Sequence, residues 1–172
     1  MIQGSTTTNT FIQPYLFFGG RCEEALEFYH KTVGAEIGKV MLHKESPEPP
    51  PPGTLQPGFE NKVMHADFRI GESALMASDG CHEGSSFSGF SLSIVVPTEA
   101  EVDRVFTALA EGGQVKMPPA KTFWSPRFGM LTDRFGIGWM VSAAAEPIPA
   151  EPAQKASTAK KPSKRALQSS HG

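Results

Sequence analysis

The strongest constraint on the fold is an order of predicted elements that occurs twice along the chain. In each half, a strand leads into a helix that ends at glycine, and three further strands follow. The first strand recurs 78 positions later, from Gln13 to Ser91, whereas the closing strand recurs 64 positions later, from Met76 to Met140. The difference of 14 residues is about the length of one proline-rich loop, 45–58. This pattern predicts a duplicated βαβββ module of the α+β class, with one insertion in the first copy.

Both helices have clear sequence signals. Apolar residues at helical spacing predict a first helix that starts near Cys22 and stops at Gly34. The second helix follows Thr98, and Glu101 three positions later completes a capping-box pattern. Branched and aromatic residues between turn signals predict strands over 11–18, 36–43, 62–70, 74–78, 90–96, 114–117, 127–132 and 137–142.

Composition narrows the classes of function and the surroundings. The chain has 172 residues, 39% hydrophobic content and a formal net charge of −2, so no overall charge attracts nucleic acid or an anionic membrane. No apolar run approaches the ~20 residues that span a bilayer, and the polar N-terminus lacks the features of a signal peptide. Cys22 and Cys81 lie far apart in the sequence. We therefore expect a cytoplasmic protein without nucleic-acid or membrane partners.

The domain organisation follows from the same composition. We expect one folded domain over 11–144, with a first module at about 11–80 and a second at about 89–143. Residues 1–10 are expected to be disordered. Residues 145–172 are rich in Ala, Pro, Lys and Ser and contain almost no large apolar side chains. Such a segment cannot bury enough surface to offset its ordering entropy, which predicts a disordered tail.

Several segments resemble one known family. They are 14–18 (Pro-Tyr-Leu-Phe-Phe), 24–29 (Glu-Ala-Leu-Glu-Phe-Tyr), 75–80 (Leu-Met-Ala-Ser-Asp-Gly), 122–124 (Thr-Phe-Trp) and 133–139 (Asp-Arg-Phe-Gly-Ile-Gly-Trp). In this order they resemble the PhnB-like branch of the vicinal-oxygen-chelate (glyoxalase/bleomycin-resistance/dioxygenase) superfamily, over about 11–143. The resemblance implies paired βαβββ modules whose mixed sheets curl around a cleft, usually in a homodimer.

The resemblance also implies where metal ligands would lie. Metal-dependent members place four ligands, mostly His and Glu, on the first and last strand of each module. The matching positions here are Gln13, Met76, Ser91 and Met140. Two thioethers, a hydroxyl and an amide cannot replace imidazole and carboxylate ligands for Zn, Ni, Mn or Fe(II). We therefore expect no metal and no other cofactor.

Strand alternation predicts which side chains line the cleft. In the strand 62–70, His65 and Asp67 point to the side opposite Ala66 and Phe68, which must pack against the helices. The resulting surface mixes aromatic, thioether and hydrogen-bonding groups, as in sites for small organic molecules. In the loop before the penultimate strand, Trp124 either covers the cleft or anchors its own loop. The predicted cleft consists of Gln13, Tyr15, Phe17, His65, Asp67, Met76, Ser91, Ser93, Trp124 and Met140.

Three functions stay open at this point. The favoured one is a metal-independent protein that binds a small molecule, in the manner of sequestering resistance proteins. The second is an enzyme of the same superfamily, of the lyase, isomerase or dioxygenase type, with His65 as an acid–base group beside Asp67 or with an unrecognised metal site. The third is a partner-binding protein that uses the proline-rich loop 45–58 or the basic tail. A plain cross-strand hydrogen bond is the alternative role for His65.

A methyltransferase function has weaker support. Members of this branch often carry that name, but enzymes that use S-adenosylmethionine usually need a doubly wound sheet and a glycine-rich turn between strand and helix. Only Gly19 and Gly20 match such a turn here, and the strand pattern differs.

Overall fold

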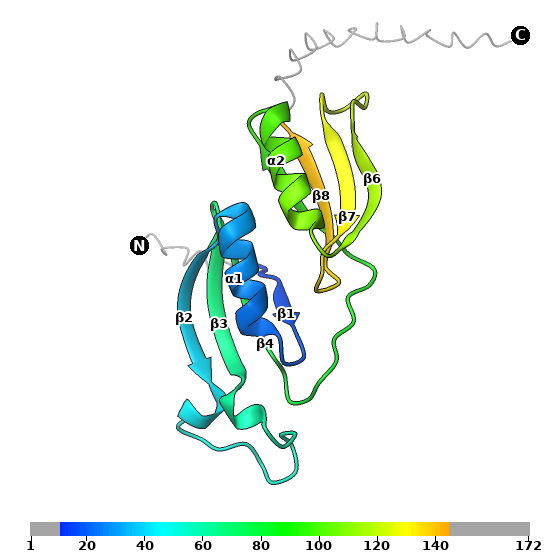
Figure 1. Cartoon of the computed structure of the whole chain (residues 1–172). Helices are drawn as coiled ribbons and strands as arrows, with labels where there is room; N and C mark the ends of the chain where they lie inside the picture. Colours follow the sequence, from blue (N-terminus) through cyan, green and yellow to red (C-terminus); the bar gives the residue numbers. More distant parts are fainter. Residues whose placement is uncertain (1–10, 145–172) are drawn as a thin grey trace, which may run out of the picture.

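The first module is a four-stranded mixed sheet with one helix. The computed structural model describes residues 11–144. The elements of this module are β1 (Tyr15–Phe17), α1 (Cys22–Val33), β2 (Glu36–Leu42), β3 (Val63–Ile70) and β4 (Ser73–Ser78), in the sheet order β1-β4-β3-β2 (Figure 1). Two 3-10 helices, His43–Glu45 and Phe59–Asn61, flank the proline-rich loop between β2 and β3. That loop projects from the end of the first module that lies away from the second module (Figure 1).

The second module repeats this plan. Its elements are β5 (Leu92–Val96), α2 (Glu99–Ala110), β6 (Gln114–Ala120), β7 (Phe128–Thr132) and β8 (Gly138–Ala143), in the sheet order β5-β8-β7-β6. In each module the first strand runs parallel to the last, and the other two pairings are antiparallel. The duplicated α+β fold predicted from the sequence is therefore confirmed.

Strand register matches the two sequence offsets. Tyr15 pairs with Met76 in the first sheet, and Ser93 pairs with Met140 in the second. Ser93 lies 78 positions after Tyr15, and Met140 lies 64 positions after Met76, which are the offsets found in the sequence. The two modules therefore present equivalent positions in equivalent pairings, although the side chains differ.

The helix ends agree with the sequence signals. Gly34 follows α1 with a φ of 69°, and its N–H donates to the carbonyl of Tyr29. Thr98 precedes α2, and its hydroxyl accepts a hydrogen bond of 3.2 Å from the N–H of Glu101. Both helix predictions are confirmed. None of the helices between residues 11 and 144 is long and apolar enough to cross a membrane.

Two strand predictions were wrong in extent. The strand expected over 11–18 is restricted to Tyr15–Phe17, because Pro14 has no N–H for a sheet ladder and contributes only its carbonyl, which accepts from Met76. The strand expected over 114–117 continues to Ala120 through two prolines. It can do so because β6 is an edge strand, and its pairing with β7 is irregular.

One core joins the two modules. The helix-facing side chains of both sheets and both helices form a single buried cluster. Tyr29 of α1 lies against Trp139 of β8, with ring centroids 5.7 Å apart, and Phe18 and Phe28 contact Phe135 in the turn before β8. The opposite faces of the two sheets therefore point away from the shared core. The disorder predicted for 1–10 and 145–172 lies outside the described residues.

Candidate functional site

The face of the first sheet that points away from α1 carries half of the predicted site. We call it the first open face, defined by Tyr15, Phe17, His65, Asp67 and Met76. The side chains that alternate with them, including Leu16, Ala66 and Ala77, are buried in the core. Strand alternation therefore brings these five predicted residues to one uncovered surface.

A chain of hydrogen bonds crosses this face. The hydroxyl of Tyr15 lies 3.1 Å from Nδ1 of His65, and Nε2 of His65 lies 3.2 Å from Oδ1 of Asp67. Tyr15 belongs to β1, whereas His65 and Asp67 are two positions apart on β3, with β4 between the two strands. An imidazole oriented by a carboxylate and linked to a phenol can accept or deliver a proton.

Aromatic rings extend the same surface. The rings of Tyr15 and Phe17 are stacked, with centroids 4.9 Å apart and an interplanar angle of 28°. Phe17 is 53% exposed, which is unusual for a phenylalanine in a sheet. Met76 pairs with Tyr15 across β1 and β4 and is half-buried. The first open face therefore offers a flat apolar surface beside polar atoms.

The corresponding face of the second sheet is chemically different. We call it the second open face, defined by Ser93, Met117, Met130 and Met140. These residues form a cross-strand row, because Ser93 pairs with Met140, Met140 with Met130 and Met130 with Met117. Methionine side chains are flexible and polarisable, so such a surface can adapt its shape to an apolar partner.

Trp124 lies in the loop between β6 and β7. It is 50% exposed and packs edge-on against Phe123 and Phe128, at centroid distances of 4.5 and 5.7 Å. Trp124 does not anchor its own loop. Ser125 does so, because it is buried and donates to the carbonyls of Arg127 and Ala143. This geometry leaves Trp124 free to contact a ligand or a partner.

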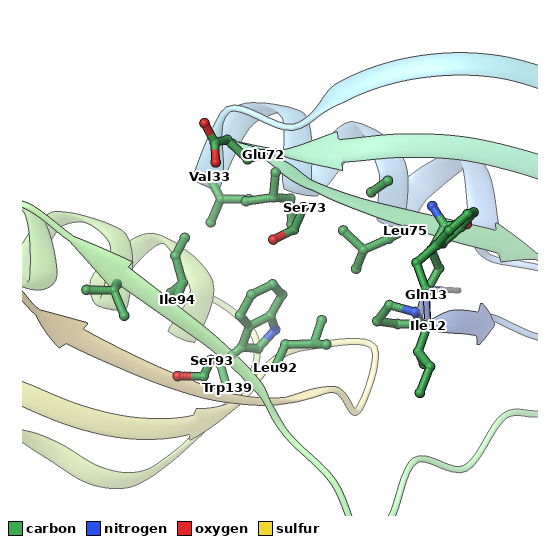
Figure 2. A pocket seen from close by; sticks show the side chains of 16 residues that line it. Ile12, Gln13, Val33, Glu72, Ser73, Leu75, Leu92, Ser93, Ile94 and Trp139 are labelled. Carbon is green, nitrogen blue, oxygen red and sulfur yellow. The ribbon is translucent and has the colours of Figure 1, made fainter. Parts of the chain in front are cut away.

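A groove of about 740 Å³ lies where the two modules meet. Figure 2 shows Leu75 and Ser73 on one side and Leu92 and Trp139 on the other. Two predicted cleft residues, Gln13 and Ser93, line this groove. Among residues 11–144, no side-chain hydrogen bond or aromatic contact connects the first open face with the second. A single chain therefore keeps the two open faces apart, although Gln13 of the first module and Ser93 of the second share the groove.

Ser91 precedes β5 and lies next to Gly138 of β8. A Cβ atom at position 138 would lie only 2.7 Å from the hydroxyl oxygen of Ser91. This close approach explains the glycine at the start of β8, and it leaves Ser91 exposed at the edge of the second sheet.

Two buried aspartates were not predicted as important. Asp79 accepts hydrogen bonds from the N–H groups of Gly20, Cys22 and Val63, at 2.7–2.9 Å. Its carboxylate therefore caps the start of α1 and ties this helix to β3. The available signal was an aspartate directly after β4, but its partners lie 16, 57 and 59 positions away, and no local pattern identifies them.

Asp133 has a similar role in the second module. Oδ1 accepts from the N–H groups of Phe135 and Ile137, and Oδ2 accepts from Tyr29 and from the indole N–H of Trp139. The strands predicted over 127–132 and 137–142 imply a turn at this position, which the structure shows, but the sequence did not predict the link to α1. This aspartate fixes the turn and joins the two modules through the core.

Burial changes the acid–base properties of two core residues. It raises the pKa of the Tyr29 phenol strongly, and the neighbouring Asp133 carboxylate raises it further. Burial likewise raises the pKa of the Cys22 thiol far above its ordinary value, with smaller contributions from Asp79 and Glu23. Cys22 is therefore a packing residue without thiolate character.

The donor atoms at the family's four ligand positions do not suit Zn, Ni, Mn or Fe(II). Met76 pairs with Tyr15 in the first sheet, and Met140 pairs with Ser93 in the second. Two of the four positions where the family places metal ligands therefore carry thioethers. Among residues 11–144, no three His, Cys, Asp or Glu side chains converge on one point. His65 and Asp67 supply two such donors, fewer than a catalytic zinc site uses.

Comparisons with known proteins identify the family. The family described as 3-demethylubiquinone-9 3-methyltransferase matches residues 10–142. The chain belongs to this family. Protein YjdN from Escherichia coli is 35% identical over 143 residues, which cover 78% of this chain and 96% of YjdN.

Solved structures agree with this assignment. Protein PA1353 from Pseudomonas aeruginosa is 43% identical with a TM-score of 0.68, over 78% of this chain and 97% of PA1353. A PhnB protein from Bacillus cereus is 30% identical with a TM-score of 0.65, over 78% of this chain and all of that protein. A glyoxylase/bleomycin resistance/dioxygenase domain from Frankia shares the fold at 12% identity and a TM-score of 0.56, over 79% of this chain and 98% of that domain. The predicted PhnB-like membership is confirmed, and the chain has the predicted glyoxalase/bleomycin-resistance fold.

The family description implies a methyl donor, and the residues here do not fit one. The turn at Gly19 and Gly20 is the only candidate between a strand and a helix in the first module. Its amide groups are already used, because Gly20 and Cys22 donate to the Asp79 carboxylate. A Cβ on Gly19 would lie 2.6 Å from the backbone of Gly84, so a second loop fills the remaining space. This turn therefore offers no site for S-adenosylmethionine.

Proposed function

We propose that this protein binds a small organic molecule without the help of a metal, and that the first open face supplies the specific contacts. The observation that carries the proposal is the Tyr15–His65–Asp67 hydrogen-bond chain beside the stacked rings of Tyr15 and Phe17. A few placed polar groups on an apolar surface are typical of small-molecule sites. The two free cysteines in residues 11–144, Cys22 and Cys81, support a reducing, cytoplasmic setting.

The hydrogen-bond chain contributes little to the fold. The side chains of His65 and Asp67 are 34% and 56% exposed, and an exposed polar pair of this kind contributes at most about 1 kcal/mol. The buried aspartates at 79 and 133 already hold the backbone around both modules. A binding role explains three aligned polar groups on this face better than a structural role does.

We further propose that two copies form a homodimer that covers both open faces. Each face carries exposed apolar side chains, among them Phe17 on the first sheet and Val95, at 63% exposure, on the second. Because the modules share their core on the helix side, no helix or strand of residues 11–144 covers either face. A two-fold axis that places the first open face of one copy against the second open face of the other would produce two identical clefts.

Such a cleft would combine different chemistries. The first open face of one copy would supply the hydrogen-bonding residues Tyr15, His65 and Asp67. The second open face of the other copy would supply an adaptable apolar wall through its methionine row, which consists of Met117, Met130 and Met140. This arrangement would place the two open faces, which one chain leaves apart, on opposite walls of one cleft.

The binding proposal can be tested with freshly purified full-length protein. Native mass spectrometry should show a co-purified small molecule, and His65→Ala should reduce the bound fraction while the NMR spectrum remains that of a folded protein. His82→Ala is the matched control, because His82 is an exposed histidine in a loop and bonds only to the carbonyl of Glu83. An equal fraction of bound small molecule in the two variants would show that His65 does not contribute to the binding site.

A second candidate function is catalysis at the same face. It is favoured by the contact between Nε2 of His65 and Asp67, because an oriented imidazole is a common general base. Turnover of α-hydroxycarbonyl and enolisable substrates should then fall with Asp67→Asn while binding is retained. Binding of these substrates without turnover would contradict the catalytic function and leave the binding function standing.

A further inference from the structure

Both ring nitrogens of His65 are already used. Nδ1 faces the Tyr15 hydroxyl at 3.1 Å, and Nε2 faces Asp67 at 3.2 Å. A ligand on this face therefore meets no free imidazole nitrogen. The polar group that contacts the ligand must therefore lie at one end of the Tyr15–His65–Asp67 hydrogen-bond chain.

The direction of the hydrogen bonds follows from the donors available. A carboxylate can only accept, so the proton on neutral His65 belongs on Nε2, where it is donated to Asp67. Nδ1 then carries a lone pair and accepts the only proton of the Tyr15 hydroxyl. Tyr15 has no proton left to donate, and its second lone pair is the free polar function at that end of the chain.

The surroundings of Tyr15 define the rest of the ligand. The hydroxyl belongs to a ring stacked on Phe17, and Met76 lies beside it on β4. Tyr15 is 37% exposed, so part of this surface is accessible. Offset stacking on aromatic rings and contact with a thioether both favour a flat, apolar partner.

From these three observations, we infer that Tyr15 is the residue that contacts the ligand and that it does so as a hydrogen-bond acceptor. The ligand class is a planar, apolar molecule that bears a hydroxyl or N–H donor. His65 and Asp67 are positioning residues that fix the acceptor state of Tyr15. The inference rests on the proposed function and adds the contact atom and the ligand class.

Two probes of matched shape test the ligand class. 4-Ethylphenol has the O–H donor, and 4-ethylanisole carries a methyl group in its place. Titration of full-length protein followed by NMR should show 4-ethylphenol binding about tenfold more tightly, which corresponds to one hydrogen bond of roughly 1.4 kcal/mol. Tyr15→Phe should bind both probes with the affinity that the wild-type protein has for 4-ethylanisole.

Asp67→Asn tests the positioning step. An asparagine amide can donate to Nε2 as well as accept from it, so it no longer fixes the proton on Nε2. The preference for the phenol should therefore shrink in this variant, although Tyr15 is intact. Asp103→Asn is the control, because Asp103 is exposed on α2 and pairs with Arg127 away from this face.

The outcomes separate the two proposals. Binding of both probes on the first open face with equal affinity overturns the acceptor role of Tyr15 and leaves the binding function standing. ¹⁵N spectra of the imidazole that place the proton of neutral His65 on Nδ1 would also overturn the acceptor role of Tyr15 and leave the binding function standing. If neither probe perturbs the signals of this face at millimolar concentration, the ligand class and the aromatic binding surface are both wrong.

Discussion

The hydroxyl of Tyr29 donates a hydrogen bond of 2.7 Å to Oδ2 of Asp133, which lies 104 positions later in the chain. Both residues are buried, and the same oxygen accepts from the indole of Trp139 at 2.8 Å. This contact ties α1 of the first module to the last hairpin of the second.

Asp133→Asn should therefore destabilise the whole domain. The amide nitrogen of asparagine cannot accept. If it replaces Oδ2, Tyr29 and Trp139 both lose their acceptor, and if it replaces Oδ1, the N–H groups of Phe135 and Ile137 do, at a cost of about 1–3 kcal/mol for each buried donor left unpaired. Urea unfolding should report this loss, whereas the exposed control Asp103→Asn should change stability by less than about 1 kcal/mol. An unchanged urea midpoint for Asp133→Asn would show that water replaces the lost acceptor.

Stability should fall at alkaline pH. Burial raises the native pKa values of Cys22 and Tyr29, so the unfolded chain loses these protons at lower pH than the folded chain does. The contribution of each group is complete below its unfolded pKa, roughly 8.5 for the thiol and 10 for the phenol, and is lost as pH rises through its native pKa. Urea midpoints should therefore decline from about pH 8.5 upward.

Two variants separate these contributions. Cys22→Ala should flatten the decline that begins near pH 8.5, and Tyr29→Phe should flatten the part above about pH 10. If both variants keep the full decline of the wild-type protein, other groups cause it.

Met130→Glu should disrupt the proposed homodimer. Met130 lies in the middle of the methionine row, and a carboxylate there would have to be desolvated against the partner. Light scattering at micromolar concentration should give a dimer mass for the wild-type protein and a monomer mass for the variant. Thr107→Glu, exposed on α2, should remain dimeric. A monomeric wild-type protein would contradict the paired clefts.

Purified protein should contain no stoichiometric Zn, Ni, Mn or Fe. The positions expected from the superfamily present Gln13, Met76, Ser91 and Met140, which offer none of the imidazole or carboxylate ligands that these metals need. Elemental analysis checks this expectation, and dialysis against EDTA should leave the melting temperature unchanged. About one equivalent of metal per chain would mean that ligands other than these four hold it.

Local patterns were sufficient to predict the modules and the first open face. Alternation in β3 separated His65 and Asp67 from Ala66 and Phe68, and the hydrophobic requirement of the core fixed which side faces the helix. The contact between Tyr15 and His65 could not be read from the sequence, because it depends on the order of strands in the sheet and on side-chain rotamers.

Contacts between residues far apart in the sequence could not be predicted for a different reason. Asp79 and Asp133 resemble ordinary turn residues, and their distant partners are backbone amides or core aromatic side chains that no spacing rule identifies. The exposure of Trp124 likewise depends on Ser125, which anchors the loop through two carbonyl groups.

The shared core has a consequence for folding. Each module contributes one side of a single apolar cluster, so neither half should be stable when it is expressed alone. The connection between them contains the exposed residues Ser85 and Ser86, outside any strand or helix. A chain cut there should still assemble from its two fragments when they are produced together, and the rejoined protein should melt in one calorimetric transition. The duplicated modules would then form one cooperative unit that tolerates a broken backbone between them but not the loss of either half.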